Sequence, residues 1–273
     1  MRTSGSTRSD PERFAALREV VGHRLTGLSG PRALLLMAAH PVAFEGFFAH
    51  TGALADPYAR LARTAVVMDA VAFGTRAEAE RATRRVRAMH RRVRGTLAEP
   101  AGRFPAGTPY AADDPALLLW ILAALADSAM LVYDKYVRRL DPPAREALWQ
   151  DYRVVGGYFG LPPAETPAIV DEFDAYMARM LGGDELFVTP RAREVALGTV
   201  MRPPAPPALR PAVELVNQIT AGLLPARVRR MYGLQWDPVR SVALHGGAEY
   251  VKRVVVPLLP DRFARLAQAR AAA

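Results

Sequence analysis

The sequence predicts an all-α fold, a single-domain bundle of many helices, and three observations support this. Helix-capping signals recur along the chain, apolar residues repeat at steps of three and four, and no paired runs of alternating apolar and polar residues indicate strands. The apolar run VVVPLL near the C-terminus is interrupted by Pro257. Strand content is therefore expected to be minor or absent.

Six expected helix starts consist of a capping residue followed by proline. Proline at the first helical position loses no hydrogen bond, because that N–H has no partner within a helix. The side-chain oxygen before the proline accepts a hydrogen bond from one of the next free amides. The six pairs are Asp56-Pro57, Asp114-Pro115, Asp141-Pro142, Thr166-Pro167, Thr189-Pro190 and Asp237-Pro238.

Length and composition indicate one large domain. The chain has 273 residues, and 51% of them are hydrophobic, which is enough for a sizeable core. We expect residues 1–12 to form a disordered N-terminal tail and residues 13–273 to form one helical domain. The proline-rich segment 202–211 is expected to cross the surface of that domain.

Charge and hydropathy restrict the partners and the location. The net charge is +9, but the aromatic residues are not interleaved with the basic runs, so no nucleic-acid partner is expected. The longest purely apolar run, residues 116–126, is shorter than the ~20 residues that span a bilayer, so no membrane span is expected. No hydrophobic segment follows the basic N-terminus, which favours a cytoplasmic location. The oligomeric state stays open.

An arginine-rich helix is expected over residues 76–94, with one histidine on its apolar face. Thr75 and Glu78 have the spacing of a capping box, and Gly74 and Gly95 mark the two boundaries. The inward stripe consists of Ala79, Ala82, Val86, Met89, His90 and Val93, which recur at steps of three and four. The arginines of this segment fall on the opposite arc and can reach solvent or ligand carboxylates.

Few residues remain that could carry chemistry. Without cysteine the chain cannot form thiolate-ligated haem, iron–sulfur clusters or cysteine zinc sites. No nucleophile elbow, phosphate-binding glycine loop or pair of metal ligands on one helical turn is present. Single histidines remain: His40 and His90 in apolar stretches, and His23, His50 and His245 in more polar ones. One histidine suffices where a cofactor completes the coordination, as haem does with its four porphyrin nitrogens.

Four segments of the chain carry a resemblance to a known family. They are GPRALLLMAAHPVAFEGF (30–47), DPYARLARTAVVMDAVAFGTRAEAERATRRVRAMHRRVRG (56–95), YAADDPALLLWILAALADS (110–128) and LLPARVRRMYGLQW (223–236). Together they resemble successive blocks of the MpaB and rubber-oxygenase catalytic-domain family, whose rubber-cleaving members are all-α haem b oxygenases. The resemblance implies a buried haem pocket with His90 as the proximal iron ligand, and with Arg60 and Thr64 beside the haem.

The chain departs from the family pattern at two positions and matches it loosely at a third. Arg63 stands where the rubber enzymes have a lysine that can cap the iron, so a lysine-capped state is not expected. Leu122 stands where many relatives have a second histidine. Glu45 lies 15 residues before Arg60 and is the candidate for the family's distal glutamate, although a helix-end carboxylate paired with an arginine is the alternative.

The resulting hypothesis is a haem b-dependent oxygenase that acts with dioxygen on a small apolar substrate. An alkene or an isoprenoid chain is the substrate class that the resemblance implies, and Arg60, Thr64 and Glu45 are the expected catalytic residues. Two alternatives stay open. One is a haem-binding sensor or carrier without turnover, and the other is a cofactor-free helical interaction protein in which His90 is a core residue.

Overall fold

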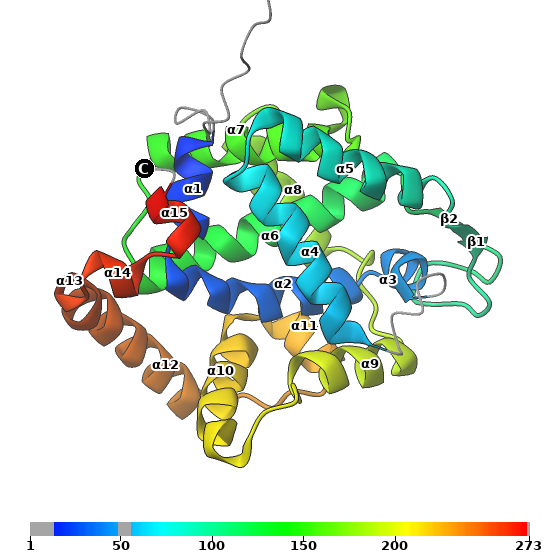
Figure 1. The fold of residues 1–273 in the computed structure, drawn as a ribbon. Helices are drawn as coiled ribbons and strands as arrows, with labels where there is room; N and C mark the ends of the chain where they lie inside the picture. Colours follow the sequence, from blue (N-terminus) through cyan, green and yellow to red (C-terminus); the bar gives the residue numbers. More distant parts are fainter. Residues whose placement is uncertain (1–13, 49–55, 272–273) are drawn as a thin grey trace, which may run out of the picture.

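The structure is a computed structural model that describes residues 14–48 and 56–271. Helices dominate it, and Figure 1 shows them packed around α6 and α2. The first half contains α1 (Ala15–Val21), η1 (Arg24–Leu28), α2 (Ser29–Ala38), α3 (Pro41–Phe48), α4 (Pro57–Ala72), α5 (Arg76–His90), β1 (Arg94–Thr96), β2 (Pro109–Ala111) and α6 (Pro115–Tyr136). The expected tail of residues 1–12 and His50 lie outside the described residues.

The second half is also helical. It contains α7 (Pro142–Phe159), η2 (Pro163–Glu165), α8 (Val170–Gly182), α9 (Pro190–Val200), η3 (Pro207–Leu209), α10 (Arg210–Leu223), α11 (Ala226–Met231), α12 (Pro238–Tyr250), the π-helical η4 (Val251–Val255), α13 (Val256–Leu258), α14 (Asp261–Ala264) and α15 (Ala267–Ala271). The all-α fold class is confirmed. The division into a tail and one domain stays a prediction.

The core surrounds α6. This helix packs against α2, α7 and α8, and one continuous apolar cluster joins these elements. Its largest fully buried side chains include Trp120 of α6, Trp149 of α7 and Tyr232 after α11. Burying an aromatic side chain of this size removes the most apolar surface from water per residue, so these positions contribute strongly to stability.

The helix starts confirm the Asp-Pro and Thr-Pro signals, with one exception. Helices α4, α6, α7, α9 and α12 each begin at the expected proline, and the preceding Asp or Thr side chain accepts an amide hydrogen bond. The start expected at Thr166-Pro167 is wrong, because the Thr166 hydroxyl donates to the Pro162 carbonyl oxygen instead. Helix α8 begins at Val170, whose amide donates to Glu146 Oε2 of α7 over 2.8 Å.

Helix α5 is shorter than its sequence pattern predicted. The capping box of Thr75 and Glu78 is confirmed, but the helix ends at His90 rather than near Gly95. Residues 94–96 form β1, which pairs antiparallel with β2 and places Gly95 opposite Tyr110. A Cβ at Gly95 would clash with the Tyr110 hydroxyl group, so the glycine permits this pairing. Met89, expected to face inward, is 46% exposed.

The apolar stretch around His40 forms two helices. Helix α2 ends at Ala38 and α3 begins at Pro41. A residue before proline is disfavoured in helical conformation, so the chain turns at His40. The His40 Nδ1 atom accepts a hydrogen bond from the Ala43 amide over 3.3 Å, and this contact caps α3.

Helix α6 is, among the described residues, the one helix long and apolar enough to cross a membrane. Its 22 residues include an 18-residue window with mean hydropathy 2.0, and 61% of that window is buried inside the domain. A helix in the centre of a protein core has the same composition. The expectation that the chain does not span a membrane stays a prediction.

Candidate functional site

Helices α4 and α5 form an antiparallel pair that brings Arg60 and His90 close together. The two helices contact each other and are joined by the short turn at Phe73 and Gly74 (Figure 1). Arg60 lies in the first turns of α4 and His90 is the last residue of α5, so the turn places them at the same end of the pair. The positive charge of Arg60 is near enough to lower the pKa of His90.

The His90 side chain is a partly buried, neutral imidazole. Burial lowers its pKa most, the Arg60 charge lowers it further, and Asp113 opposes both effects. Its Nδ1 atom is buried and has no hydrogen-bond partner among the described residues. An unpaired buried polar atom costs about 1–3 kcal/mol, so a ligand that satisfied the imidazole would be stabilised at this position.

Arg60 is a half-buried cation at the edge of the apolar interior. Burial, with a smaller contribution from the Arg63 charge, lowers its pKa to about 10, so it stays protonated at neutral pH. A guanidinium in such surroundings attracts carboxylates strongly, because little water competes for it. Arg63 is exposed and lies on the outer side of α4.

Thr64 does not join Arg60 and His90. Its side chain is exposed, and its hydroxyl donates to the Arg60 carbonyl oxygen over 3.1 Å. Residues 62–66 of α4 are all exposed. Five consecutive residues sweep more than one helical turn, so this level of α4 stands clear of the other described elements and leaves space beside the helix.

Glu45 lies on α3, away from the cavity lining described below. Its carboxylate lies 3.8 Å from the Arg191 guanidinium of α9, and its side chain is 25% exposed. Burial raises the pKa of Tyr110, and the negative charge of Glu45 raises it further. This contact agrees with the alternative interpretation of Glu45, a carboxylate that pairs loosely with an arginine. A distal role for Glu45 stays untested.

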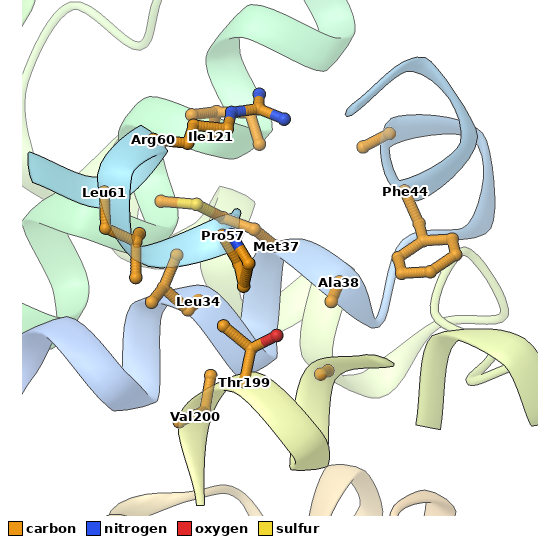
Figure 2. A pocket seen from close by; sticks show the side chains of 12 residues that line it. Leu34, Met37, Ala38, Phe44, Pro57, Arg60, Leu61, Ile121, Thr199 and Val200 are labelled. Carbon is orange, nitrogen blue, oxygen red and sulfur yellow. The ribbon is translucent and has the colours of Figure 1, made fainter. Parts of the chain in front are cut away.

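An apolar cavity lies between α2, α3, α4 and α9. Its volume is about 50 Å³, which is room for a few water molecules. Figure 2 shows the Arg60 side chain and the Thr199 hydroxyl on opposite sides of this space. The lining residues are Leu34, Met37, Ala38, Ala43, Phe44, Pro57, Arg60, Leu61, Ile121, Ala196, Thr199 and Val200. The cavity wall is therefore almost entirely apolar, and Arg60 and Thr199 are the polar residues that contribute to it.

The contribution of α9 to this cavity was missed by sequence reasoning. Helix α9 supplies Ala196, Thr199 and Val200, and their small or branched side chains carry no recognisable signal. Outside the cavity lining, Trp120 of α6 is fully buried, and its indole Nε1 has no hydrogen-bond partner within the described residues. A tryptophan in an otherwise aliphatic run was the available signal for that buried polar atom.

Two of the other described histidines cap helices, and the third is exposed at the surface. His40 is buried, caps α3 and lies against Phe104, with ring centroids 5.4 Å apart. His23 caps η1 through Nδ1, and His245 is exposed on α12. Within residues 14–48 and 56–271, no three His, Asp or Glu side chains gather as a metal-binding group. A metal site in this part would therefore depend on ligands from a cofactor.

The fold and the site define an all-α protein in which a partly buried imidazole lies near a cation, Arg60, that lines an apolar cavity. Residues 18–267 match the family described as ER-bound oxygenase mpaB/B'/rubber oxygenase, catalytic domain, and the chain belongs to that family. The family resemblance seen in the sequence is thus confirmed. The match extends beyond the four resembling segments to the C-terminal helices.

Individual relatives are distant. The uncharacterised proteins Rv2237 of Mycobacterium tuberculosis and Mb2261 of Mycobacterium bovis are each 28% identical to this chain over 188 residues. The aligned part covers 68% of this chain and 69% of each relative. No solved structure matches the chain significantly.

Proposed function

We propose that the protein is a haem b-dependent oxygenase in which the His90 imidazole would hold the haem iron. The observation that carries the proposal is the buried, unpaired Nδ1 atom of His90 beside the Arg60 cation. Membership of an oxygenase catalytic-domain family supports the reaction class. Haem, when bound, would supply the redox chemistry that activates dioxygen.

The residues present fit a haem group in their chemistry. A neutral imidazole is the ligand that haem iron takes, and burial keeps His90 neutral at physiological pH. Arg60 supplies the cation that a propionate carboxylate would pair with. The clear flank of α4 at residues 62–66 provides space beside the two residues.

The apolar cavity supports a small apolar substrate. Its walls offer Leu, Met, Phe and Ile side chains, which exclude water and would orient a hydrocarbon by shape. Thr199 and Arg60 lie on opposite sides of the space that this molecule would occupy (Figure 2). An alkene or an isoprenoid chain is the proposed substrate class. Thr64 and Glu45 remain proposed catalytic residues. We also propose a cytoplasmic location for the protein.

The test replaces His90 by alanine and measures haem bound per chain. Alanine preserves helix propensity, so His90→Ala should keep the helical circular dichroism spectrum and lose most of its Soret absorbance. His245→Ala is the matched control, because His245 is exposed on α12 and its removal should leave the haem content unchanged. Retention of haem at the wild-type ratio by His90→Ala would reject the ligand assignment.

Oxygen consumption separates turnover from haem storage. Purified haem-loaded protein should consume dioxygen when candidate alkenes are added, and Arg60→Gln should lower that rate. A red protein that consumes no dioxygen with any alkene would be a sensor or carrier. A colourless protein that takes up no haem would be the cofactor-free interaction protein.

A further inference from the structure

The outward face of the C-terminal helices is apolar. Val239, Val242 and Tyr250 of α12 are 77%, 73% and 61% exposed, and Leu258 of α13 is 77% exposed. Together with Val254 of η4, these residues are three, eight, four and four positions apart, which places them on one side of a continuous helix. We name these five residues the outer stripe.

The opposite face of the same helix is apolar too. Leu244, Ala248 and Val251 pack inward against α6 and α10 in a small cluster with Val132 and Leu223. A surface helix normally turns a polar face to water, and a helix that is apolar on both faces is normally covered on both. The outer stripe therefore requires a covering partner.

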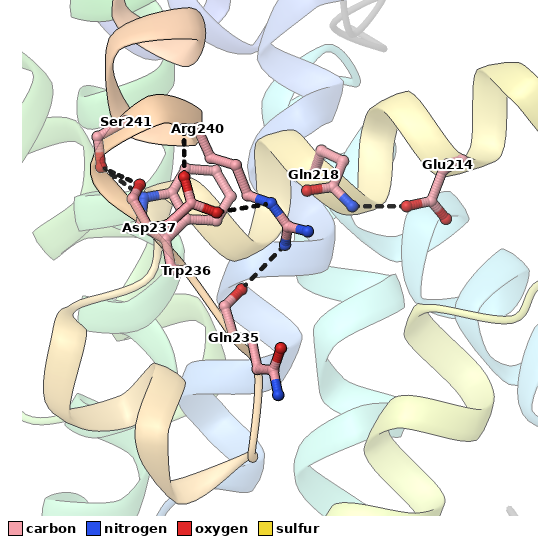
Figure 3. A network of polar contacts seen from close by, with 7 residues as sticks. All are labelled: Glu214, Gln218, Gln235, Trp236, Asp237, Arg240 and Ser241. Carbon is pink, nitrogen blue, oxygen red and sulfur yellow. Dashed lines mark hydrogen bonds and ion pairs between the residues drawn. The ribbon is translucent and has the colours of Figure 1, made fainter.

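A polar network fixes the start of α12 and so the direction of the stripe. Asp237 Oδ1 accepts the Arg240 amide over 2.8 Å, and Trp236 Nε1 donates to Ser241 Oγ over 2.7 Å (Figure 3). Arg240 also donates to the Gln235 carbonyl oxygen. These contacts bind the first turn of α12 to the loop before it, so Val239 and Val242 point outward in a defined orientation.

Positive charge is concentrated in the same part of the chain. Residues 202–273 contain eleven Lys and Arg but four Asp and Glu, so they carry +7 of the net charge of +9. At the stripe itself, the Arg253 side chain is 77% exposed and pairs with Glu249 over 2.7 Å, and that of Arg240 is 48% exposed and pairs with Asp237 over 3.2 Å. The Arg262 guanidinium lies over the exposed Phe263 ring, 4.9 Å from its centroid. Cations thus border an apolar surface.

We propose that the outer stripe docks the protein onto an anionic lipid surface. Val, Leu and Tyr side chains at such a surface enter the boundary between headgroups and acyl chains, and flanking arginines pair with lipid phosphates. A second copy of this chain would bring an equal positive charge to the same face and be repelled. Residues 1–13, MRTSGSTRSDPER, have the wrong composition to cover an apolar stripe.

The test measures binding of the full-length protein to vesicles by sedimentation. Vesicles of equimolar phosphatidylcholine and phosphatidylglycerol should bind the protein at least about tenfold more tightly than phosphatidylcholine vesicles, and added salt should weaken the binding. Val242→Glu with Leu258→Glu should reduce the affinity by about tenfold or more. Val154→Glu, at an exposed valine on α7, is the control and should bind as the wild type does.

A second measurement does not depend on those charge substitutions. The chain has no cysteine, so Val242→Cys carries a single polarity-sensitive dye, which should shift to the blue with anionic vesicles, whereas a dye on Val154→Cys should not. An unshifted dye at position 242, or full binding by the double glutamate variant, would overturn the proposal. So would a dimer in light scattering that the double variant abolishes, because the occupant would then be a second copy. Neither measurement uses haem or turnover, so the result is independent of the proposed reaction.

Discussion

His40 illustrates how burial changes the role of a single residue. The sequence suggested it as a second candidate for the site because it lies in an apolar stretch, and the structure makes it a helix cap instead. Burial is the largest cause that lowers its pKa, to about 4. At neutral pH it is therefore an uncharged ring whose Nδ1 atom accepts the Ala43 amide.

This environment predicts a loss of stability in mild acid. The pKa of His40 is about 4 in the folded protein and 6.5 in the unfolded chain, so the unfolded state binds more protons between these values. Its contribution to stability is full above pH 6.5 and falls as the pH drops toward 4, by about 1.4 kcal/mol per pH unit. His40→Asn keeps a capping side chain and should lose about 1.5 kcal/mol less than the wild type between pH 6.5 and 5.

Chemical denaturation at a series of pH values measures this difference. His245→Asn is the control, because His245 is exposed and its replacement should leave the pH dependence of the wild type in place. Parallel stability curves for the wild type and His40→Asn would contradict the assigned role of His40.

At the scale of one element, the α5 helix depends on its first turn. The Thr75 hydroxyl accepts the Glu78 amide over 3.3 Å, and Glu78 Oε2 accepts the Thr75 amide over 2.8 Å. The apolar face of this arginine-rich helix is narrow, since Ala79 and Thr83 are its buried residues. Local capping therefore contributes more to α5 than to a helix in the core.

Removal of the cap should destabilise the protein by an amount typical of capping boxes. Thr75→Ala is expected to lower the free energy of unfolding by about 1 kcal/mol, measured by urea denaturation. The combined change of Arg85 and Arg92 to Gln is the comparison, because both side chains are exposed. It should alter stability by less than about 1 kcal/mol. A larger loss, or loss of haem from that double variant, would mean that the arginine face holds a ligand.

At the scale of the whole molecule, Arg32 joins three helices. Its guanidinium donates to Asp127 Oδ2 over 2.6 Å and to Ser128 Oγ over 2.7 Å on α6. Its Nε atom donates to the Leu223 carbonyl oxygen at the end of α10, over 2.9 Å. The arginine side chain is 4% exposed, so these bonds are largely shielded from water.

Arg32→Met should destabilise the whole domain. The change leaves the Asp127 carboxylate and the Leu223 carbonyl without their partner, at a cost of about 3 kcal/mol. Asp127→Asn in the same background should recover part of that loss, because an amide tolerates the missing cation better. Thermal and urea denaturation would measure both variants, and a single variant as stable as the wild type would show that α10 docks without this bridge.

The sequence was sufficient for features that depend on a few neighbouring residues. The all-α class, five proline-marked helix starts and the capping box at Thr75 follow from hydrogen bonds within one helical turn. The proximity of Arg60 and His90 followed from the family resemblance together with a short helical hairpin. The caps and helix starts involve residues within one helical turn, so short sequence patterns predict them.

Tertiary packing decided the rest. Helix α8 starts where Glu146 of another helix can accept its amide, and α5 ends at His90 because the β1–β2 pairing takes over the following residues. The cavity needs Thr199, which lies more than a hundred residues from Arg60 in the chain. The position of the outer stripe depends on which face of α12 packs inward. Each of these features depends on which distant segments meet, and helical periodicity reports the faces of an element but not its neighbours.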